Sequence, residues 1–140
     1  MIKYTKLPKD IEAFIPRTAS YLQSRTDIHF AYLFGSLAKG KTSPLSDVDI
    51  AVYLSEDADF IENKMEILGK LMNLLQTDEI DLVILNTAPL MLRMKILENK
   101  KVIVDRDPFL RHNYESLTMR KYFDFSIREM AILERRFLYG

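Results

Sequence analysis

Two apolar runs separated by a short polar segment dominate the first half of the sequence. They cover residues 30–34 and 50–54, and each has the length of a β-strand. A Gly-Ser pair, residues 35–36, follows the first run, and an Asp-Val-Asp triplet, residues 47–49, directly precedes the second. This order predicts two neighbouring strands of one sheet, with a tight turn and two aspartates at the same edge.

The residues at that edge suit a metal-bound phosphate. Because side chains two apart in a strand share a face, Asp47 and Asp49 direct two carboxylates at one point. Such carboxylates repel each other unless a cation lies between them, and Mg²⁺ takes oxygen ligands from carboxylates and substrate phosphates. Gly35 permits a tight turn with a close approach to a ligand, and Ser36 offers a hydroxyl and an N–H group.

The remaining apolar patterns complete an alternation of helices and strands. Helices are predicted over residues 8–25, 36–39, 58–75, 89–98 and 107–139, and strands over residues 28–34, 47–54, 80–85 and 101–105. This alternation indicates an α/β (α+β) fold, in which helices pack against a small mixed sheet. We expect a single domain over residues 1–140, with a core over about 8–105 and a helical tail over about 107–139.

Two helical segments carry apolar patterns that predict burial. In the segment 58–75 the spacing of four and three residues predicts a buried stripe of Ile61, Met65, Leu68, Met72 and Leu75. The tail over 107–139 is rich in aromatic residues, which we expect to pack mainly on the sheet. A helix of this composition also suits a partner surface.

A third carboxylate interrupts the apolar segment over residues 80–85. Asp81 is the one charged residue there, and a carboxylate in such a strand costs free energy unless it is paired, exposed or bound to a cation. We therefore expect Asp81 to lie at a strand end or to contribute to the same metal site.

Composition excludes several classes of site. The sequence has no cysteine, so disulfides and thiolate metal sites are absent, and its two histidines argue against a histidine zinc site. Lysine plus arginine equals aspartate plus glutamate at 20 each, which argues against direct binding of nucleic acid. We find no apolar run long enough to span a membrane and no signal peptide, and expect a cytoplasmic protein.

The motif Gly-Ser-x10-Asp-x-Asp is the signature of the DNA polymerase β-like nucleotidyltransferase superfamily. The chain resembles its minimal members over about residues 8–105, and is most similar to the MntA-type MNT-domain antitoxins of HEPN/MNT toxin–antitoxin modules. The resemblance implies the nucleotidyltransferase fold, with ATP as donor and two Mg²⁺ ions. The site residues that it implies are Asp47, Asp49 and Asp81 as catalytic residues and metal ligands, and Gly35, Ser36, Ser46 and Lys39 as nucleotide-binding residues.

The resemblance also implies a reaction and a partner. It predicts transfer of AMP from ATP to a tyrosine of a HEPN-family ribonuclease toxin, which would neutralise the toxin within a hetero-oligomer. One alternative is an enzyme that modifies a small hydroxylated molecule, as aminoglycoside nucleotidyltransferases do. A second alternative is an antitoxin that acts by contact alone, because a motif does not prove turnover.

Overall fold

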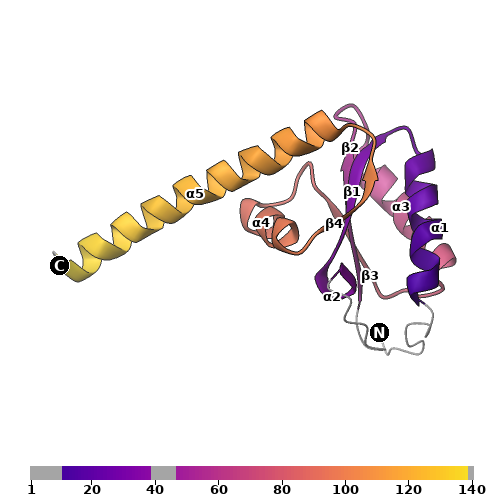
Figure 1. Cartoon of the computed structure of the whole chain (residues 1–140), viewed down its shortest axis with the longest axis horizontal. Helices are drawn as coiled ribbons and strands as arrows, with labels where there is room; N and C mark the ends of the chain where they lie inside the picture. The colour runs from indigo at the N-terminus through magenta and orange to yellow at the C-terminus, as the bar shows by residue number, and fades with distance from the viewer. Residues whose placement is uncertain (1–10, 39–46, 139–140) are drawn as a thin grey trace.

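The computed structural model describes residues 11–38 and 47–138, which form five helices and four strands (Figure 1). The helices are α1 (Ile11–Ser24), α2 (Gly35–Ala38), α3 (Phe60–Leu75), α4 (Leu90–Glu98) and α5 (Pro108–Leu138), and the strands are β1 (Ile28–Phe34), β2 (Val48–Leu54), β3 (Ile80–Ile84) and β4 (Lys101–Asp105). The predicted α/β class and the predicted alternation of elements are confirmed. The boundaries differ by a few residues, and residues 8–10, 39 and 139 of the predicted helices lie outside the described part.

The four strands form one mixed sheet in the order β3-β2-β1-β4. β1 runs antiparallel to both β2 and β4, whereas β2 and β3 are parallel. The antiparallel register pairs Phe34 with Asp49, and the parallel register pairs Asp49 with Asp81. The end of β1 and the beginnings of β2 and β3 therefore meet at one edge of the sheet.

Helices cover both faces of the sheet (Figure 1). α1 and α3 pack on one face, where residues such as Leu22, Ile50 and Leu71 form the larger hydrophobic core. α4 and the first half of α5 pack on the other face around a smaller core that includes Phe30 and Ile96. Both faces of the central strands are buried, which explains the near-continuous apolar sequences of β1 and β2.

The predicted buried stripe of the second long helix is wrong in its first half. α3 begins after Asp59, whose carboxylate accepts hydrogen bonds from the N–H groups of the first turn, as N-cap residues do. Its fully buried residues are Ile67, Leu71 and Leu75, while Ile61 and Met65 are 80% and 64% exposed. The helix is thus rotated about its axis relative to the prediction, and two large apolar side chains face solvent.

A buried polar network holds the first half of α5 on the sheet. Glu115, only 8% exposed, accepts a hydrogen bond of 2.6 Å from the hydroxyl of Tyr32 in β1. Arg111 forms ion pairs with Glu115 at 3.1 Å and with Asp105 of β4 at 3.0 Å. Because all of these charges are paired, they can be buried at acceptable cost and fix the direction in which α5 leaves the sheet.

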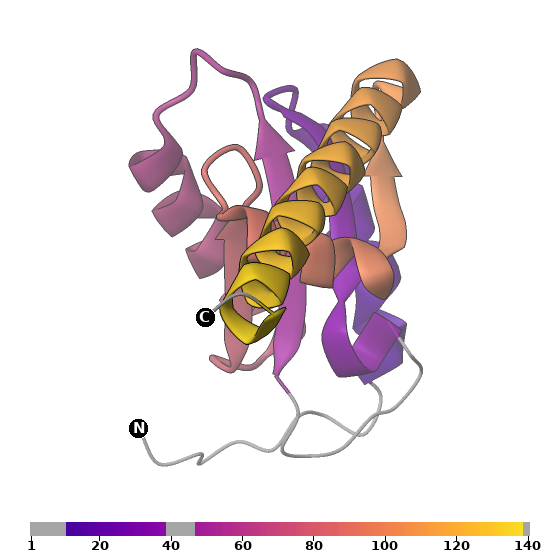
Figure 2. The same cartoon turned by 90° about the vertical axis from the view of Figure 1, so that its left-hand side faces the viewer.

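The second half of α5 extends away from the rest of the protein (Figure 1). Figure 2 is viewed from the side toward which the helix projects, and α5 there lies in front of the strands. All residues from 127 to 137 are exposed, and we call this segment the free half of α5. The expectation that the aromatic residues of the tail pack on the sheet is therefore wrong for Phe109, Phe123, Phe125 and Phe137, whereas Tyr114 does pack there against Phe30 and Tyr53.

Candidate active site

The turn after β1 brings the backbone against a carboxylate of β2. β1 ends at Phe34, and Gly35 takes a φ of +71°, a conformation that favours glycine. A Cβ atom added at Gly35 would overlap Oδ2 of Asp49 and would lie 3.1 Å from its Cγ. Ser36 follows in the short helix α2. The turn therefore requires glycine both for its backbone conformation and for its contact with Asp49.

The two other predicted carboxylates belong to the same edge of the sheet. Asp81 lies directly opposite Asp49 in the parallel ladder, so the two side chains share the face on which α4 packs. Asp47 is exposed and immediately precedes β2. Of the seven site residues predicted from the sequence, the described part contains five. Gly35 and Ser36 begin α2, Asp47 directly precedes β2, and Asp49 and Asp81 lie near the starts of β2 and β3.

The electrostatics of this edge suit a hard divalent cation. The pKa of Asp49 is raised from 3.8 to about 6. Burial is the largest cause, the negative charges of Asp81 and Asp47 add to it, and the positive charge of Lys95 lowers the pKa. No three acidic or histidine side chains among residues 11–38 and 47–138 are close enough to hold a metal ion by themselves. The oxygen donors fit Mg²⁺, which typically completes its shell with waters and substrate phosphates.

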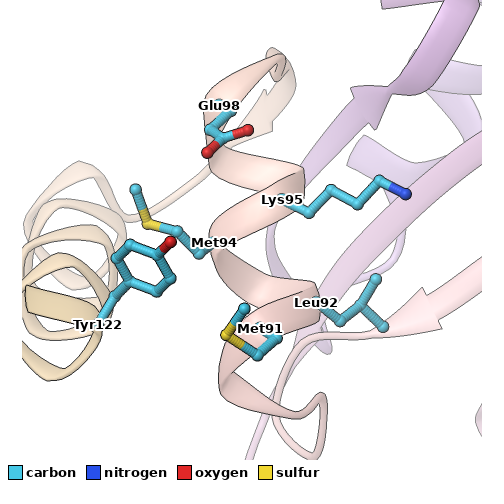
Figure 3. Close-up of a pocket in the computed structure, with 6 residues that line it drawn as sticks. All are labelled: Met91, Leu92, Met94, Lys95, Glu98 and Tyr122. Carbon is cyan, nitrogen blue, oxygen red and sulfur yellow. The ribbon is translucent and has the colours of Figure 1, made fainter. Parts of the chain in front are cut away.

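Lys95 is a site residue that the sequence analysis missed. It lies on α4 and acts electrostatically on Asp49, although the two residues are far apart in the sequence. Figure 3 shows its side chain extending from α4 toward the strands, while Met94 on the same helix points toward α5. One available indication was its spacing of three residues from Leu92, which places the two side chains on neighbouring positions of one helix face.

Two hollows share Leu92 in their walls, and one of them includes Asp81 in its lining. The first, which we call the edge groove, has a volume of about 460 Å³ and runs along β3 from Asp81 to Ile84, between the first turn of α3 and the segment that leads into α4. The second lies between α4 and α5 and has a volume of about 300 Å³. Its lining residues, drawn in Figure 3, are Met91, Leu92, Met94, Lys95, Glu98 and Tyr122.

The remaining two predicted nucleotide-binding residues, Lys39 and Ser46, lie outside the described residues. Both belong to the segment between α2 and β2. Their proposed contacts with a nucleotide stay predictions from the sequence.

The site geometry agrees with the family to which the sequence is related. The family model described as "Polymerase beta, Nucleotidyltransferase" matches residues 17–109, about two thirds of the chain. The chain belongs to the polymerase β nucleotidyltransferase family. The resemblance indicated by the Gly-Ser and Asp-x-Asp motifs is therefore confirmed, and with it the assignment to the nucleotidyltransferases.

One similar protein is MJ1547 of Methanocaldococcus jannaschii, whose name describes it as a protein adenylyltransferase. It is 33% identical over 115 residues, which cover 75% of this chain and 86% of MJ1547. The similarity spans most of both proteins, so it includes the edge of the sheet where the carboxylates lie.

Solved structures of this nucleotidyltransferase fold include complexes of toxin–antitoxin modules. A toxin–antitoxin with AMP-PNP aligns with a TM-score of 0.71 and 24% identity over 87% of this chain and 98% of the other. A tri-AMPylated Shewanella oneidensis HEPN toxin in complex with an MNT antitoxin aligns with a TM-score of 0.67 and 22% identity over 90% and 98%. At these identities the likeness establishes the fold. No helix in the described part of the chain is long and apolar enough to cross a membrane.

Proposed function

We propose that this nucleotidyltransferase transfers AMP from ATP to a tyrosine hydroxyl of a HEPN-type toxin, with which it forms a complex, and thereby neutralises the toxin. The observation that carries the proposal is the meeting of Gly35, Asp49 and Asp81 at one edge of the sheet. A protein acceptor is supported by the name of MJ1547 and by the AMPylated toxin held by the S. oneidensis MNT antitoxin.

Three carboxylates are the proposed metal ligands. Asp47, Asp49 and Asp81 would hold two Mg²⁺ ions, and a cation there would offset the burial and the like charges that raise the pKa of Asp49. When bound, such ions neutralise charge on a triphosphate and favour ionisation of the attacking hydroxyl.

The other site residues would position the donor. The backbone of Gly35 and the hydroxyl and N–H of Ser36 would hold phosphate oxygens, because the turn brings them beside Asp49. Lys95 would place a positive charge near the same phosphates, because it acts electrostatically on Asp49. Ser46 and Lys39 belong to the same proposal as further phosphate contacts.

The chemical step then joins the two substrates directly. The tyrosine oxygen forms a bond to the α-phosphorus of ATP, and the bond from that phosphorus to the bridging oxygen breaks. Pyrophosphate leaves with the electron pair of that bond. The phenol proton passes to a carboxylate of the site, and we assign this role to Asp81, which is exposed near the start of β3.

Intact-mass spectrometry tests this function. The purified chain is incubated with ATP and Mg²⁺, alone and with the protein encoded by the adjacent gene, and Asp49→Asn serves as the inactive control. We expect the partner to gain one or more AMP masses with the wild-type chain only, and fragmentation to locate them on tyrosine.

The other outcomes separate the alternatives. A tight complex without any mass gain would refute transfer and favour an antitoxin that acts by contact. Neither complex nor mass gain would direct the search to small hydroxylated acceptors. A mass gain that persists with Asp49→Asn would contradict the assignment of the carboxylate cluster.

A further inference from the structure

The edge groove runs along a strand with one unpaired side. Within the described part of the chain, β3 is the outer strand of the sheet beside β2. In the ladder to β2, the carbonyl of Glu79 accepts from the N–H of Val48 at 2.9 Å, and the N–H of Leu85 donates to the carbonyl of Val52 at 2.8 Å. Because β-strands alternate, residues 79, 81, 83 and 85 direct their backbone groups toward β2.

The intervening residues therefore direct their backbone groups into the edge groove. The N–H and C=O of Leu82 point outward, as do those of Ile80 and the N–H of Ile84, whereas the carbonyl of Ile84 accepts a turn hydrogen bond from Thr87. An outer strand with such a row of donors and acceptors is a template for another strand. Proteins commonly block the open side of an outer strand with charges or proline, but Asp81 is the one charged residue within β3.

The walls of the groove add apolar surface on both sides of this edge. Ile61 of α3, 80% exposed, lines one side together with Phe60 and the charged Lys64, and Pro89 and Leu92 line the other. Strand addition gains affinity from backbone hydrogen bonds and specificity from such flanking side-chain contacts. Ile61, which the helical pattern predicted to be buried, is thus an apolar side chain exposed in the wall of this groove.

We propose that the edge groove binds the acceptor as an extended segment that pairs with β3 and presents its tyrosine beside Asp81. This inference rests on the proposed adenylyltransferase function and adds the form in which the acceptor is recognised. The groove is continuous with the active site, because Asp81 belongs to both. β4, at the other end of the sheet, pairs with β1 and is separated from Asp81 by two strands.

Strand geometry determines where the tyrosine would lie. Residues directly opposite each other on paired strands direct their side chains to the same face, and neighbouring strands are about 4.8 Å apart. Asp49 and Asp81 already share one face as opposite residues of β2 and β3. A tyrosine opposite Asp81 on the added strand therefore joins that row and extends over the carboxylates.

The first test places a charge on the apolar wall and leaves the carboxylates unchanged. Ile61→Glu introduces a buried charge into the docked complex, whereas Met65→Glu makes the same change one turn along α3, at an exposed residue that does not line the groove. The measurements are KM for the full-length acceptor protein identified by mass spectrometry, kcat, and binding of a fluorescent ATP analogue.

We expect Ile61→Glu to raise KM for the acceptor about tenfold, with little change in analogue binding, and Met65→Glu to behave like the wild-type chain. Equal KM values for Ile61→Glu and the wild-type chain would overturn the docking proposal while leaving the transferase function intact. Absence of any AMP transfer by the wild-type chain would instead refute the proposed function, so the two failures are distinguishable.

The second test locates the acceptor segment directly. Since the chain has no cysteine, Ile61→Cys provides a unique thiol for a photoreactive cross-linker, and Met65→Cys is its matched control. We expect the thiol of Ile61→Cys to cross-link to the acceptor at a position within about four residues of the modified tyrosine. This range corresponds to the four residues of β3 that line the groove. Cross-links elsewhere on the acceptor, or the same pattern from Met65→Cys, would overturn the proposal.

Discussion

The metal-free protein tolerates an ionised Asp49 only at a cost in stability, and the isosteric change Asp49→Asn measures this cost. Folding raises the pKa of Asp49 from 3.8 to about 6, chiefly by burial and then by Asp81 and Asp47. A difference of about two units corresponds to ~3 kcal/mol at about 1.36 kcal/mol per unit. Because the carboxylate remains partly exposed to water, screening reduces this to about 1 kcal/mol.

The sign follows from the direction of the pKa change. Below the unfolded value of 3.8 the carboxyl group is largely protonated in both states, and above about 6 it is largely ionised in both. The cost therefore appears as pH rises between these values and is complete above them. We expect Asp49→Asn to raise the free energy of unfolding by about 1 kcal/mol at about pH 8, and by only a fraction of this near pH 4.

Urea unfolding in EDTA at several pH values provides the assay. Asp124→Asn, at an exposed position on α5, controls for the simple loss of one negative charge. Added Mg²⁺ is expected to stabilise the wild-type chain more than Asp49→Asn, because the variant lacks a ligand. An asparagine variant that is no more stable than the wild-type chain at pH 8, or whose gain is the same at every pH, would refute the reasoning.

Three further substitutions test other parts of the site and the fold. Gly35→Ala places a Cβ against Asp49 at a φ of +71°. We expect the free energy of unfolding, measured with urea, to fall by about 1–2 kcal/mol and the rate of AMP transfer to fall at least tenfold. Retained activity would contradict the packed turn. Lys95→Met removes the positive charge near Asp49. We expect KM for ATP to rise about tenfold, while the free energy of unfolding changes little. An unchanged KM would exclude a contact between Lys95 and the phosphates. Glu115→Ala leaves Arg111 without its buried partner, and we expect the free energy of unfolding to fall by about 3 kcal/mol. Glu134→Ala, on the free half of α5, is the control and should lower it by less than about 0.5 kcal/mol. Equal small losses for the two variants would show that the network does not anchor the helix.

That the predicted site residues lie at one edge of the sheet could be inferred from the sequence because the pattern is local. Gly35 and Ser36 follow a strand directly, and Asp47 and Asp49 are two residues apart, so strand periodicity alone brings them to one edge. Lys95 could not be assigned in this way. It reaches the site only because α4 docks on the same sheet face as the carboxylates, and that placement depends on tertiary packing rather than on spacing.

α3 shows a second limit of the pattern. Its sequence contains two overlapping apolar stripes, one through Phe60, Ile67 and Leu71 and the other through Ile61 and Met65. Both have helical spacing, and they differ by one residue, which is a rotation of about 100° around the axis. The sheet surface selects the first stripe, so Ile61 is left in the wall of the edge groove.

The direction of α5 divides one continuous helix into two parts of unequal local stability. Up to about Tyr122 its side chains contact α4 or the sheet, and the buried Glu115 network ties it to β1. From residue 127 to 137 every residue is exposed, so helical structure there depends on its own backbone hydrogen bonds. Amide hydrogen exchange is therefore expected to be slow before Ser126 and to quicken turn by turn beyond it, which makes the exchange rate of this segment a sensitive report on whether anything covers it.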